Sequence, residues 1–335
     1  MEYRLLGKTG LKVSRMGFGG IPIQRIDAEG TRALMHGLLE NGVNYIDTAR
    51  GYTVSEEYLG YGLEGIREHF VLATKSMSRT AEAMARDIDI SLKNLRTDYI
   101  DLYQIHNPPP ADLEKITAPG GALEALTEAK KAGKIGHIGI TAHSLETFRM
   151  ALELPWVETI MFPYNIVEEQ ARELIHACAE KNIGFIDMKP LAGGAIEDAT
   201  AALRYVCANP DVTVVIPGMA DPAELKQNLA AVSDASPLTQ EEKAKMEAIR
   251  KALGTQFCRR CNYCQPCTAG IGISSVFLFE GYLSRYGLAQ WARSRYAALD
   301  KKASDCVGCG VCESRCPYHL PIREMLKKAA EKFGE

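Results

Sequence analysis

The sequence lacks any long hydrophobic run, and no stretch approaches the roughly 18 consecutive apolar residues that a helix needs to cross a membrane. It also lacks a strong charge of either sign, because its formal net charge is −3. Such a balanced chain has no electrostatic reason to bind nucleic acid or an anionic membrane, so neither partner is expected. The opening MEYRLLGKTG has no apolar core of the kind found in secretory leaders, and we therefore expect a cytoplasmic protein.

Cysteine is scarce in most of the chain. Cys178 and Cys207 stand alone within helical patterns and read as small buried apolar residues, whereas the other eight cysteines all follow residue 257. In a reducing compartment, clustered cysteines two residues apart favour metal binding over disulfides. The 335 residues, 46% of them apolar, allow one large domain and a small one.

Residues 15 to about 233 alternate short apolar runs with amphipathic stretches. Eight strand-then-helix units in this length predict a closed parallel barrel, the (β/α)8 TIM barrel. The leading YRLLGKTGLKV predicts a β-hairpin that caps the amino-terminal end of the barrel. The expected strands are Arg15 to Gly17, Tyr45 to Asp47, Phe70 to Thr74, Tyr99 to Gln104, Ile135 to Thr141, Thr159 to Phe162, Gly184 to Met188 and Val212 to Pro217.

A domain boundary is expected at the end of the next helix. Thr239 and Glu242 form a capping-box pattern at the start of that helix, and Gly254 ends it. We therefore expect a barrel over residues 1–254 and a small cysteine-rich domain over residues 255–335.

Four titratable residues follow three successive predicted strands. Asp47 and Tyr52 follow the second strand, Lys75 the third and His106 the fourth. Each alone could be a cap, a rim residue or a solvated side chain. Because active sites of parallel barrels lie at the carboxyl ends of the strands, the four together predict a catalytic site.

These residues, with the opening YRLLGKTGLKVSRMGFGG, make residues 1 to about 233 resemble the aldo-keto reductase superfamily. The resemblance implies hydride exchange between NAD(P)H and a small carbonyl or alcohol substrate. It makes Tyr52 the general acid, with Lys75 favouring the phenolate and Asp47 holding Lys75 charged. His106 is implied to donate a hydrogen bond to the carbonyl oxygen.

The segments that hold the nicotinamide amide and ring in the family differ here. Thr141 and Ala142 stand where many members have a Ser-Asn pair, Met161 replaces a Gln, and Met188 replaces a stacking Tyr. Thr141 can still form a hydrogen bond. Asn165 could supply an amide to the cofactor or stabilise a turn.

The segment IPGMADPAELKQNLAAV resembles the family's phosphate- and adenine-binding segment. It would bind the cofactor through Pro217, Gly218, Met219, Gln227 and Asn228, with the start of a helix facing a phosphate. No Lys or Arg follows Gly218 directly, so NADH and NADPH both remain open. Lys189 is expected to contact cofactor phosphate or substrate, or to pair with an acid at the barrel rim.

The eight clustered cysteines form two groups. The first is Cys258, Cys261, Cys264 and Cys267, and the second is Cys306, Cys309, Cys312 and Cys316, followed by Pro317. Zinc is the alternative metal for these cysteines, but three cysteines two residues apart with a remote fourth favour a [4Fe-4S] cluster. The second group follows the ferredoxin spacing more closely than the first. By the crossed ligation of two-cluster ferredoxins, Cys316 is expected to join the first group and Cys267 the second.

The whole chain resembles the branch of aldo-keto reductases with a C-terminal 4Fe-4S ferredoxin-type domain. The helical insert between the cysteine groups predicts that this small domain is mainly α-helical. The resemblance implies two [4Fe-4S] clusters, an anaerobic host, and ferredoxin or another electron-transfer partner. Hydride carries two electrons and a cluster one, so a flavin-linked reductase is an alternative. An electron-transfer or assembly protein with a relic barrel is another.

Overall fold

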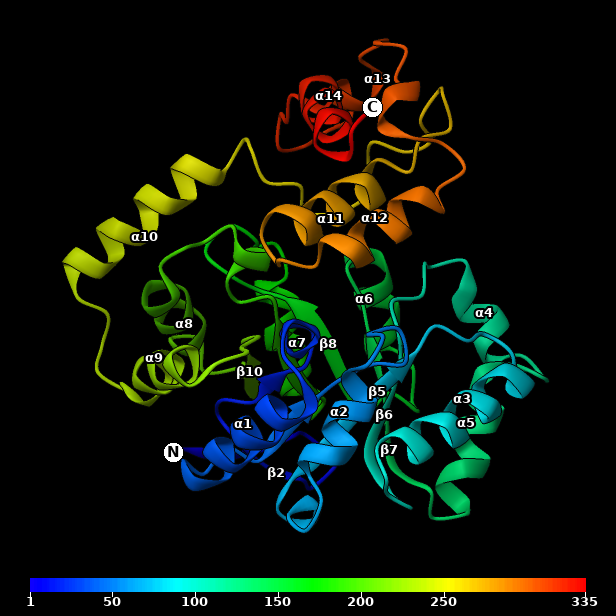
Figure 1. Ribbon diagram of the computed structural model, residues 1–335, viewed down its shortest axis with the longest axis vertical. Helices are drawn as coiled ribbons and strands as arrows, with labels where there is room; N and C mark the ends of the chain where they lie inside the picture. Colours follow the sequence, from blue (N-terminus) through cyan, green and yellow to red (C-terminus); the bar gives the residue numbers. More distant parts are fainter.

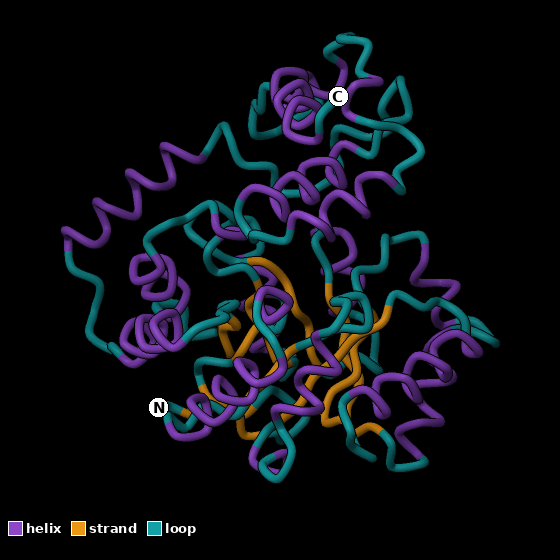
Figure 2. Tube along the Cα trace, in the orientation of Figure 1, coloured by secondary structure: helices purple, strands orange, loops and turns teal.

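The computed structural model describes residues 1–335, and eight parallel strands form its centre (Figures 1 and 2). Adjacent strands pair in chain order, and isolated bridges from Met16 to Val215 and from Gly19 to Gly218 join the first strand to the last. The predicted (β/α)8 barrel is therefore confirmed. Its strands are β3 Phe18–Gly19, β4 Tyr45–Asp47, β5 Val71–Ser76, β6 Ile100–Ile105, β7 Ile135–Thr141, β8 Thr159–Pro163, β9 Gly184–Met188 and β10 Val214–Ile216.

The first barrel strand lies later than predicted. We expected it at Arg15 to Gly17, but the regular pairing with β4 begins at Phe18. In residues 15–17, the Gly17 N–H donates to the Val215 carbonyl oxygen, the Val215 N–H donates to the Arg15 carbonyl oxygen, and the Arg15 N–H donates to the Glu2 carbonyl oxygen. The segment GFGG at residues 17–20 has one side chain only, so the sequence shows no alternating pattern that would locate a two-residue strand.

Helices surround the barrel (Figure 2). Several begin at a residue whose side chain accepts a backbone N–H of the first turn, as Asp27, Thr80 and Ser144 do. The helices are α1 Ala28–Glu40, α2 Ser55–Gly62, α3 Ala81–Asn94, α4 Asp112–Thr117, α5 Ala122–Lys131, α6 Leu145–Leu152, α7 Arg172–Glu180, α8 Ala199–Cys207 and α9 Pro222–Ser233, with short 3-10 turns at η1 Pro22–Arg25, η2 Arg67–His69 and η3 Ala192–Gly194.

The N-terminal hairpin closes the amino end of the barrel, as predicted. Its strands β1 Tyr3–Leu5 and β2 Lys12–Ser14 pair antiparallel. Leu6 is fully buried and packs in one cluster with side chains at the starts of barrel strands, such as Val71 and Val214. Because the hairpin covers the amino ends of the strands, the open face of the barrel is at their carboxyl ends.

The helix α10 Gln240–Leu253 carries the chain from the barrel to the C-terminal region (Figure 1). It starts with the predicted capping box of Thr239 and Glu242. The residues after it contain α11 Ile273–Ser284, α12 Ala289–Ala297, η4 Ala303–Asp305, α13 Val311–Ser314 and α14 Ile322–Phe333. They form their own apolar cluster around Cys264, Cys312 and Cys316. On this basis we propose the domain division between residues 254 and 255.

The C-terminal domain lies over the barrel, with α11 and α12 nearest to it and α13 and α14 farther away (Figure 1). It is mainly helical, as predicted. None of the helices has both the length and the apolar character needed to cross a membrane.

Candidate functional site

The four predicted catalytic residues converge at the carboxyl end of the barrel. Asp47 is the last residue of β4, Lys75 lies near the end of β5, and His106 directly follows β6. These strands are neighbours in the sheet, so their ends meet. Tyr52 reaches the same place from the loop between β4 and α2.

Asp47 and Lys75 form a buried ion pair. The Lys75 ammonium donates to Asp47 Oδ2 and, at 2.8 Å, to the carbonyl oxygen of Thr48. Gln104 Nε2 donates to Asp47 Oδ1 at 3.2 Å. Burial raises the pKa of Asp47 and lowers the pKa of Lys75, and their mutual attraction opposes both shifts. Thr48 thus fixes the Lys75 end of the pair, and Gln104 fixes the Asp47 end.

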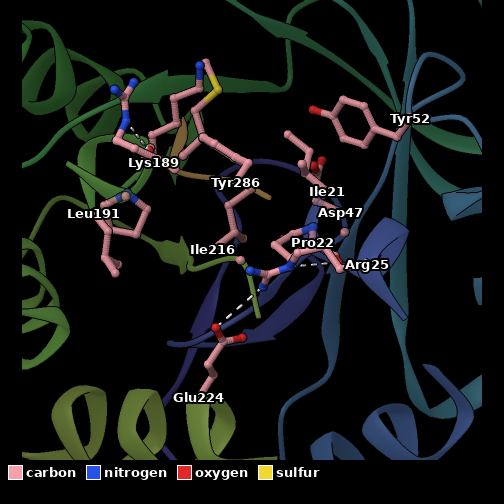
Figure 3. Close-up of a pocket in the computed structure, with 18 of the residues that line it drawn as sticks. Ile21, Pro22, Arg25, Asp47, Tyr52, Lys189, Leu191, Ile216, Glu224 and Tyr286 are labelled. Atoms are coloured by element: carbon pink, nitrogen blue, oxygen red, sulfur yellow. Dashed lines mark hydrogen bonds and ion pairs between the residues drawn. The ribbon is translucent and has the colours of Figure 1, made fainter. Parts of the chain in front are cut away.

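Tyr52 lies against this pair and directs its hydroxyl into a pocket (Figure 3). The Lys75 ammonium is 4.9 Å from the centre of the Tyr52 ring. Burial, followed by the charge of Asp47, raises the pKa of Tyr52 well above its ordinary value near 10. The expectation that Lys75 lowers this pKa is therefore outweighed by burial, and the Tyr52 hydroxyl holds its proton.

His106 packs edge to face on Tyr52, with ring centroids 6.1 Å apart and an interplanar angle of 87°. Burial, followed by the charge of Lys75, lowers the pKa of His106 well below its ordinary value near 6.5. Its Nδ1 is buried without a hydrogen-bond partner. The imidazole is therefore neutral and carries one N–H donor.

The pocket beside Tyr52 has an apolar floor. Met188 and Ile216 contribute from the ends of β9 and β10, and Met161 contributes from the middle of β8. The complete lining is Gly19, Gly20, Ile21, Pro22, Arg25, Asp47, Tyr52, Met161, Met188, Lys189, Pro190, Leu191, Gly193, Gly194, Ile216, Gly218, Glu224, Arg285 and Tyr286. The floor suits an uncharged ring or a small organic substrate, and Met161 and Met188 leave it without amide or aromatic contacts.

Two predicted cofactor contacts are occupied by the protein itself. The Thr141 hydroxyl accepts the Asn107 N–H at 2.9 Å. The Asn165 amide donates to Glu168 Oε2 at 2.9 Å and to the Lys189 carbonyl oxygen at 3.0 Å. Its oxygen accepts the N–H groups of Val167 and Glu168. Asn165 thus stabilises the turn after β8.

The remaining predicted contacts from the last barrel segment are spread apart. Gly218 lines the pocket, and the Pro217 carbonyl oxygen accepts the Gly19 N–H at 3.0 Å. Met219 is fully buried in the barrel core. Gln227 is exposed and Asn228 is buried, both on α9. Of this group only Gly218 faces the pocket.

The first turn of α9 carries two carboxylates. Asp221 Oδ1 accepts the N–H groups of Ala223 and Glu224, and Glu224 Oε2 accepts the Ala220 N–H at 2.6 Å. Glu224 also forms an ion pair with Arg25 at 3.5 Å, drawn in Figure 3. The helix start therefore already holds acidic groups where a phosphate was expected.

Lys189 follows β9 and also lines the pocket, and its backbone has a φ of +59°. Burial, followed by the charge of Arg260, lowers the pKa of Lys189 well below its ordinary value near 10.5. Glu168, the acid whose charge acts on Lys189, pairs with Arg260 at 3.0 Å. Lys189 is consequently available to a ligand.

The C-terminal domain completes the pocket, which the sequence did not indicate. Tyr286 and Arg285 form part of its wall, and Arg285 Nε donates to the Gly193 carbonyl oxygen at 3.1 Å. Arg295 Nη2 donates to the carbonyl oxygen of Gly51, next to Tyr52, at 3.1 Å. The helical insert has no motif from which contact with the barrel could be read. Gln104, which donates to Asp47, was also missed, but its place two residues before His106 on the same strand could have indicated it.

The eight clustered cysteines line two cavities. Cys258, Cys261, Cys264 and Cys316 surround the first, which we call the inner cavity, and Cys267, Cys306, Cys309 and Cys312 surround the second, the outer cavity. The cysteines are free thiols, and no three of them converge as ligands of a single ion would. Four thiols spread around a cavity fit a cluster in which each iron takes one thiolate better than they fit zinc.

The two cavities differ in exposure. Cys264 and Cys316 of the inner cavity are buried, and Ile273 lines both cavities and separates them. In the outer cavity Cys309 is exposed, and the neighbouring Val307 is 70% exposed. Cys312 of the outer cavity is buried, but Cys309 is the one exposed residue among the eight clustered cysteines. The outer cavity is thus the one with a cysteine at the surface.

Comparison with known proteins gives two family matches. The profile of the Aldo/keto reductase family matches residues 15–201, and that of a 4Fe-4S dicluster domain matches residues 257–321. The L-galactose dehydrogenase of Arabidopsis thaliana is 28% identical over 302 residues, covering 74% of this chain and 94% of the relative. The holo form of aldo-keto reductase AKR11C1 from Bacillus halodurans superposes with a TM-score of 0.65 at 27% identity, covering 74% of this chain and 96% of that one.

Proposed function

The chain belongs to the aldo/keto reductase family and carries a 4Fe-4S dicluster domain, and on that premise we propose that it exchanges a hydride between a nicotinamide dinucleotide and a small carbonyl or alcohol substrate. The observation that carries this proposal is the convergence of Asp47, Tyr52, Lys75 and His106 at one end of the barrel, with the Tyr52 hydroxyl facing an apolar-floored pocket. An oxidoreductase is the coarser conclusion that the family supports by itself.

The side chains divide the proton work between them. The bound nicotinamide supplies or removes the hydride. The protonated Tyr52 donates its proton to the carbonyl oxygen during reduction, and in the reverse direction its phenolate takes the proton from the alcohol. The neutral His106 orients that oxygen through its N–H, and the Lys75 and Asp47 pair stabilises negative charge that develops on Tyr52.

The acidic start of α9 favours NADH over NADPH. The resemblance places the adenosine end of the dinucleotide at this segment. A carboxylate such as Glu224 can accept a hydrogen bond from a ribose 2′-hydroxyl, but it repels a 2′-phosphate. Arg25, the cation beside Glu224, is already paired with it.

For the C-terminal domain we propose two [4Fe-4S] clusters with crossed ligation. Each cavity offers four thiols, with Cys316 in the inner set and Cys267 in the outer set. The exposed outer cavity then faces a one-electron carrier such as ferredoxin, and the inner cavity lies toward the barrel. The clusters act in electron transfer, and the domain also forms a wall of the active-site pocket.

A Tyr52→Phe variant tests the catalytic assignment. We expect reduction of a small carbonyl substrate by NADH to fall by about three orders of magnitude, because the proton donor is lost. Dinucleotide binding, measured by fluorescence of anaerobically purified protein, should be unchanged. Tyr58→Phe, on the neighbouring helix α2, is the matched control and should keep full activity.

The same measurements decide between this proposal and a relic barrel. Normal activity in Tyr52→Phe would remove the general acid from the mechanism. A protein that contains its clusters but binds neither NADH nor NADPH would favour an electron-transfer or assembly role.

A further inference from the structure

We propose that a second cavity, between the barrel and the C-terminal domain, binds a flavin nucleotide. This interdomain cavity has a volume of about 760 Å³, within the range of cofactor sites. The pocket beside Tyr52 is smaller, at about 200 Å³. The proposal rests on the proposed function only for the source of the hydride.

The interdomain cavity connects the two redox regions of the molecule. Lys189, Gly193, Arg285 and Tyr286 line both this cavity and the pocket beside Tyr52. At the other end, Cys258 and Phe277 line both this cavity and the inner cysteine cavity. A ligand bound here lies between the hydride site and the first cluster.

The charge of the lining favours a phosphate. Five basic side chains contribute to it, against the two carboxylates of Glu280 and Glu324. Glu324 pairs with Lys328, and Glu280 is shared by Lys332 and Arg285. Arg260 pairs with Glu168, which lies outside the lining, and Lys189 forms no ion pair. The lining therefore keeps more basic than acidic side chains, although most of the basic ones are already paired. The five basic side chains are Lys189, Arg260, Arg285, Lys328 and Lys332.

The apolar part of the lining suits a flat ring. Phe257, Phe277 and Tyr286 contribute aromatic surface, and Phe257 and Phe277 are otherwise buried. Phe257 lies in the linker after α10, Phe277 lies in the first half of α11, and Tyr286 lies just past the end of α11. Aromatic faces stack on planar heterocycles, and phosphate with a planar ring together describe a nucleotide.

Electron counting selects a flavin among nucleotides. Hydride transfer moves an electron pair, whereas each [4Fe-4S] cluster takes one electron. An oxidised flavin accepts the hydride of NADH, which leaves NAD⁺ and the reduced flavin anion. That anion returns one electron to each of two [4Fe-4S]²⁺ clusters and releases one proton. An external one-electron carrier then reoxidises both clusters.

The test is titration of the anaerobic, cluster-loaded full-length protein with FMN, followed by flavin fluorescence. We expect saturable binding, and binding of riboflavin about tenfold weaker because it lacks the phosphate. The double variant Lys328→Gln and Lys332→Gln should raise the dissociation constant of FMN about tenfold. Lys327→Gln, on the same helix but outside the cavity, is the matched control and should leave it unchanged.

Three results would overturn the proposal. They are absence of saturable FMN binding up to about 1 mM, equal affinity for FMN and riboflavin, and an unchanged dissociation constant in the double variant. Competition of NADH with FMN, with loss of both in the double variant, would make the cavity a dinucleotide site instead. Because FMN binding needs no turnover, the Tyr52→Phe variant should keep it, which separates this proposal from the catalytic one.

Discussion

Tyr52 and His106 are side chains whose protonation states are set by burial. The pKa of Tyr52 is raised and that of His106 is lowered, so both are neutral around pH 7. An acid with a raised pKa keeps its proton until the pH passes that higher value. A base with a lowered pKa stays unprotonated until the pH falls below that lower value. The working state of the pair therefore covers a wide pH range.

We expect kcat/KM for carbonyl reduction to be flat from about pH 6.5 to about pH 10, the ordinary pKa values of the two groups. The rate should decline only outside this window. The measurement is a pH profile with an uncharged substrate under anaerobic conditions. An acid limb near pH 6.5 that disappears in His106→Asn would show that His106 titrates normally and would contradict this account.

Glu224 is expected to select the cofactor. In Glu224→Gln the repulsion of a 2′-phosphate is removed, so the ratio of kcat/KM for NADPH to that for NADH should rise about tenfold. Steady-state kinetics with both dinucleotides measure this. Glu241→Gln, at the exposed start of α10, serves as the control. An unchanged ratio would place the adenosine end away from α9.

For single residues, the sequence was sufficient to predict the candidate catalytic side chains that lie at the ends of barrel strands. Asp47, Lys75 and His106 could be found because strand ends of a parallel barrel must meet. Contacts that depend on side-chain direction could not be found, because the sequence gives no direction. Asn165 turns inward to its own loop, and Tyr286 arrives from a helix far away in the chain.

Among the elements, α11 joins two sites that are remote in sequence. Near its start, Ile273 and Phe277 line the inner cysteine cavity. Just past its end, Tyr286 lines the active-site pocket. Tyr282 fixes this end by packing on Tyr286 and Trp291, with ring centroids 5.2 Å and 4.5 Å away. The α11 region therefore connects the inner cysteine cavity and the active-site pocket through one continuous helix.

Crossed ligation is testable by removing the fourth cysteine of each set. Cys316→Ser and Cys267→Ser should each reduce the iron content from about eight to about four atoms per chain. The cluster that remains in Cys316→Ser is the outer one, so oxygen should bleach it faster than the cluster that remains in Cys267→Ser.

Cys178→Ala is the control, because Cys178 lies in the barrel core and should not change the iron content. If ligation is not crossed, the order of bleaching reverses. If iron is near four atoms in the unmodified chain, the two-cluster proposal fails.

The elements themselves were largely predictable, because amphipathic periods and caps are local signals. The capping box of α10 appeared where Thr239 and Glu242 predicted it. The short first strand was misplaced, because residues 15–17 make only an isolated bridge to Val215 and the regular pairing with β4 starts at Phe18. A strand of two residues is too short to show a periodic pattern in the sequence.

On the scale of the whole molecule, the C-terminal domain is held directly over the catalytic loop. Arg295 on α12 donates to the Gly51 carbonyl oxygen, and the Tyr52 side chain follows in the chain. No sequence signal predicted this docking, since surface complementarity between two domains leaves no periodic pattern.

Arg295→Ala should loosen this closure and raise KM for the substrate about tenfold, as expected for the loss of one charged hydrogen bond. Cluster content should stay the same. Arg293→Ala is the matched control, because Arg293 lies on the same helix and bonds only to Phe333 within its own domain. Equal kinetics of the two variants would show that the docking contact does not shape the pocket.

The pocket wall at Tyr286 also sets an order of events during biosynthesis. The ribosome releases the barrel residues first, and domains generally fold as they emerge. A barrel that folds first would already contain Asp47, Tyr52, Lys75 and His106, whereas Arg285 and Tyr286 of the pocket wall are made later. If the clusters stabilise the fold of the C-terminal domain, the pocket wall at Tyr286 is complete only after iron has been delivered.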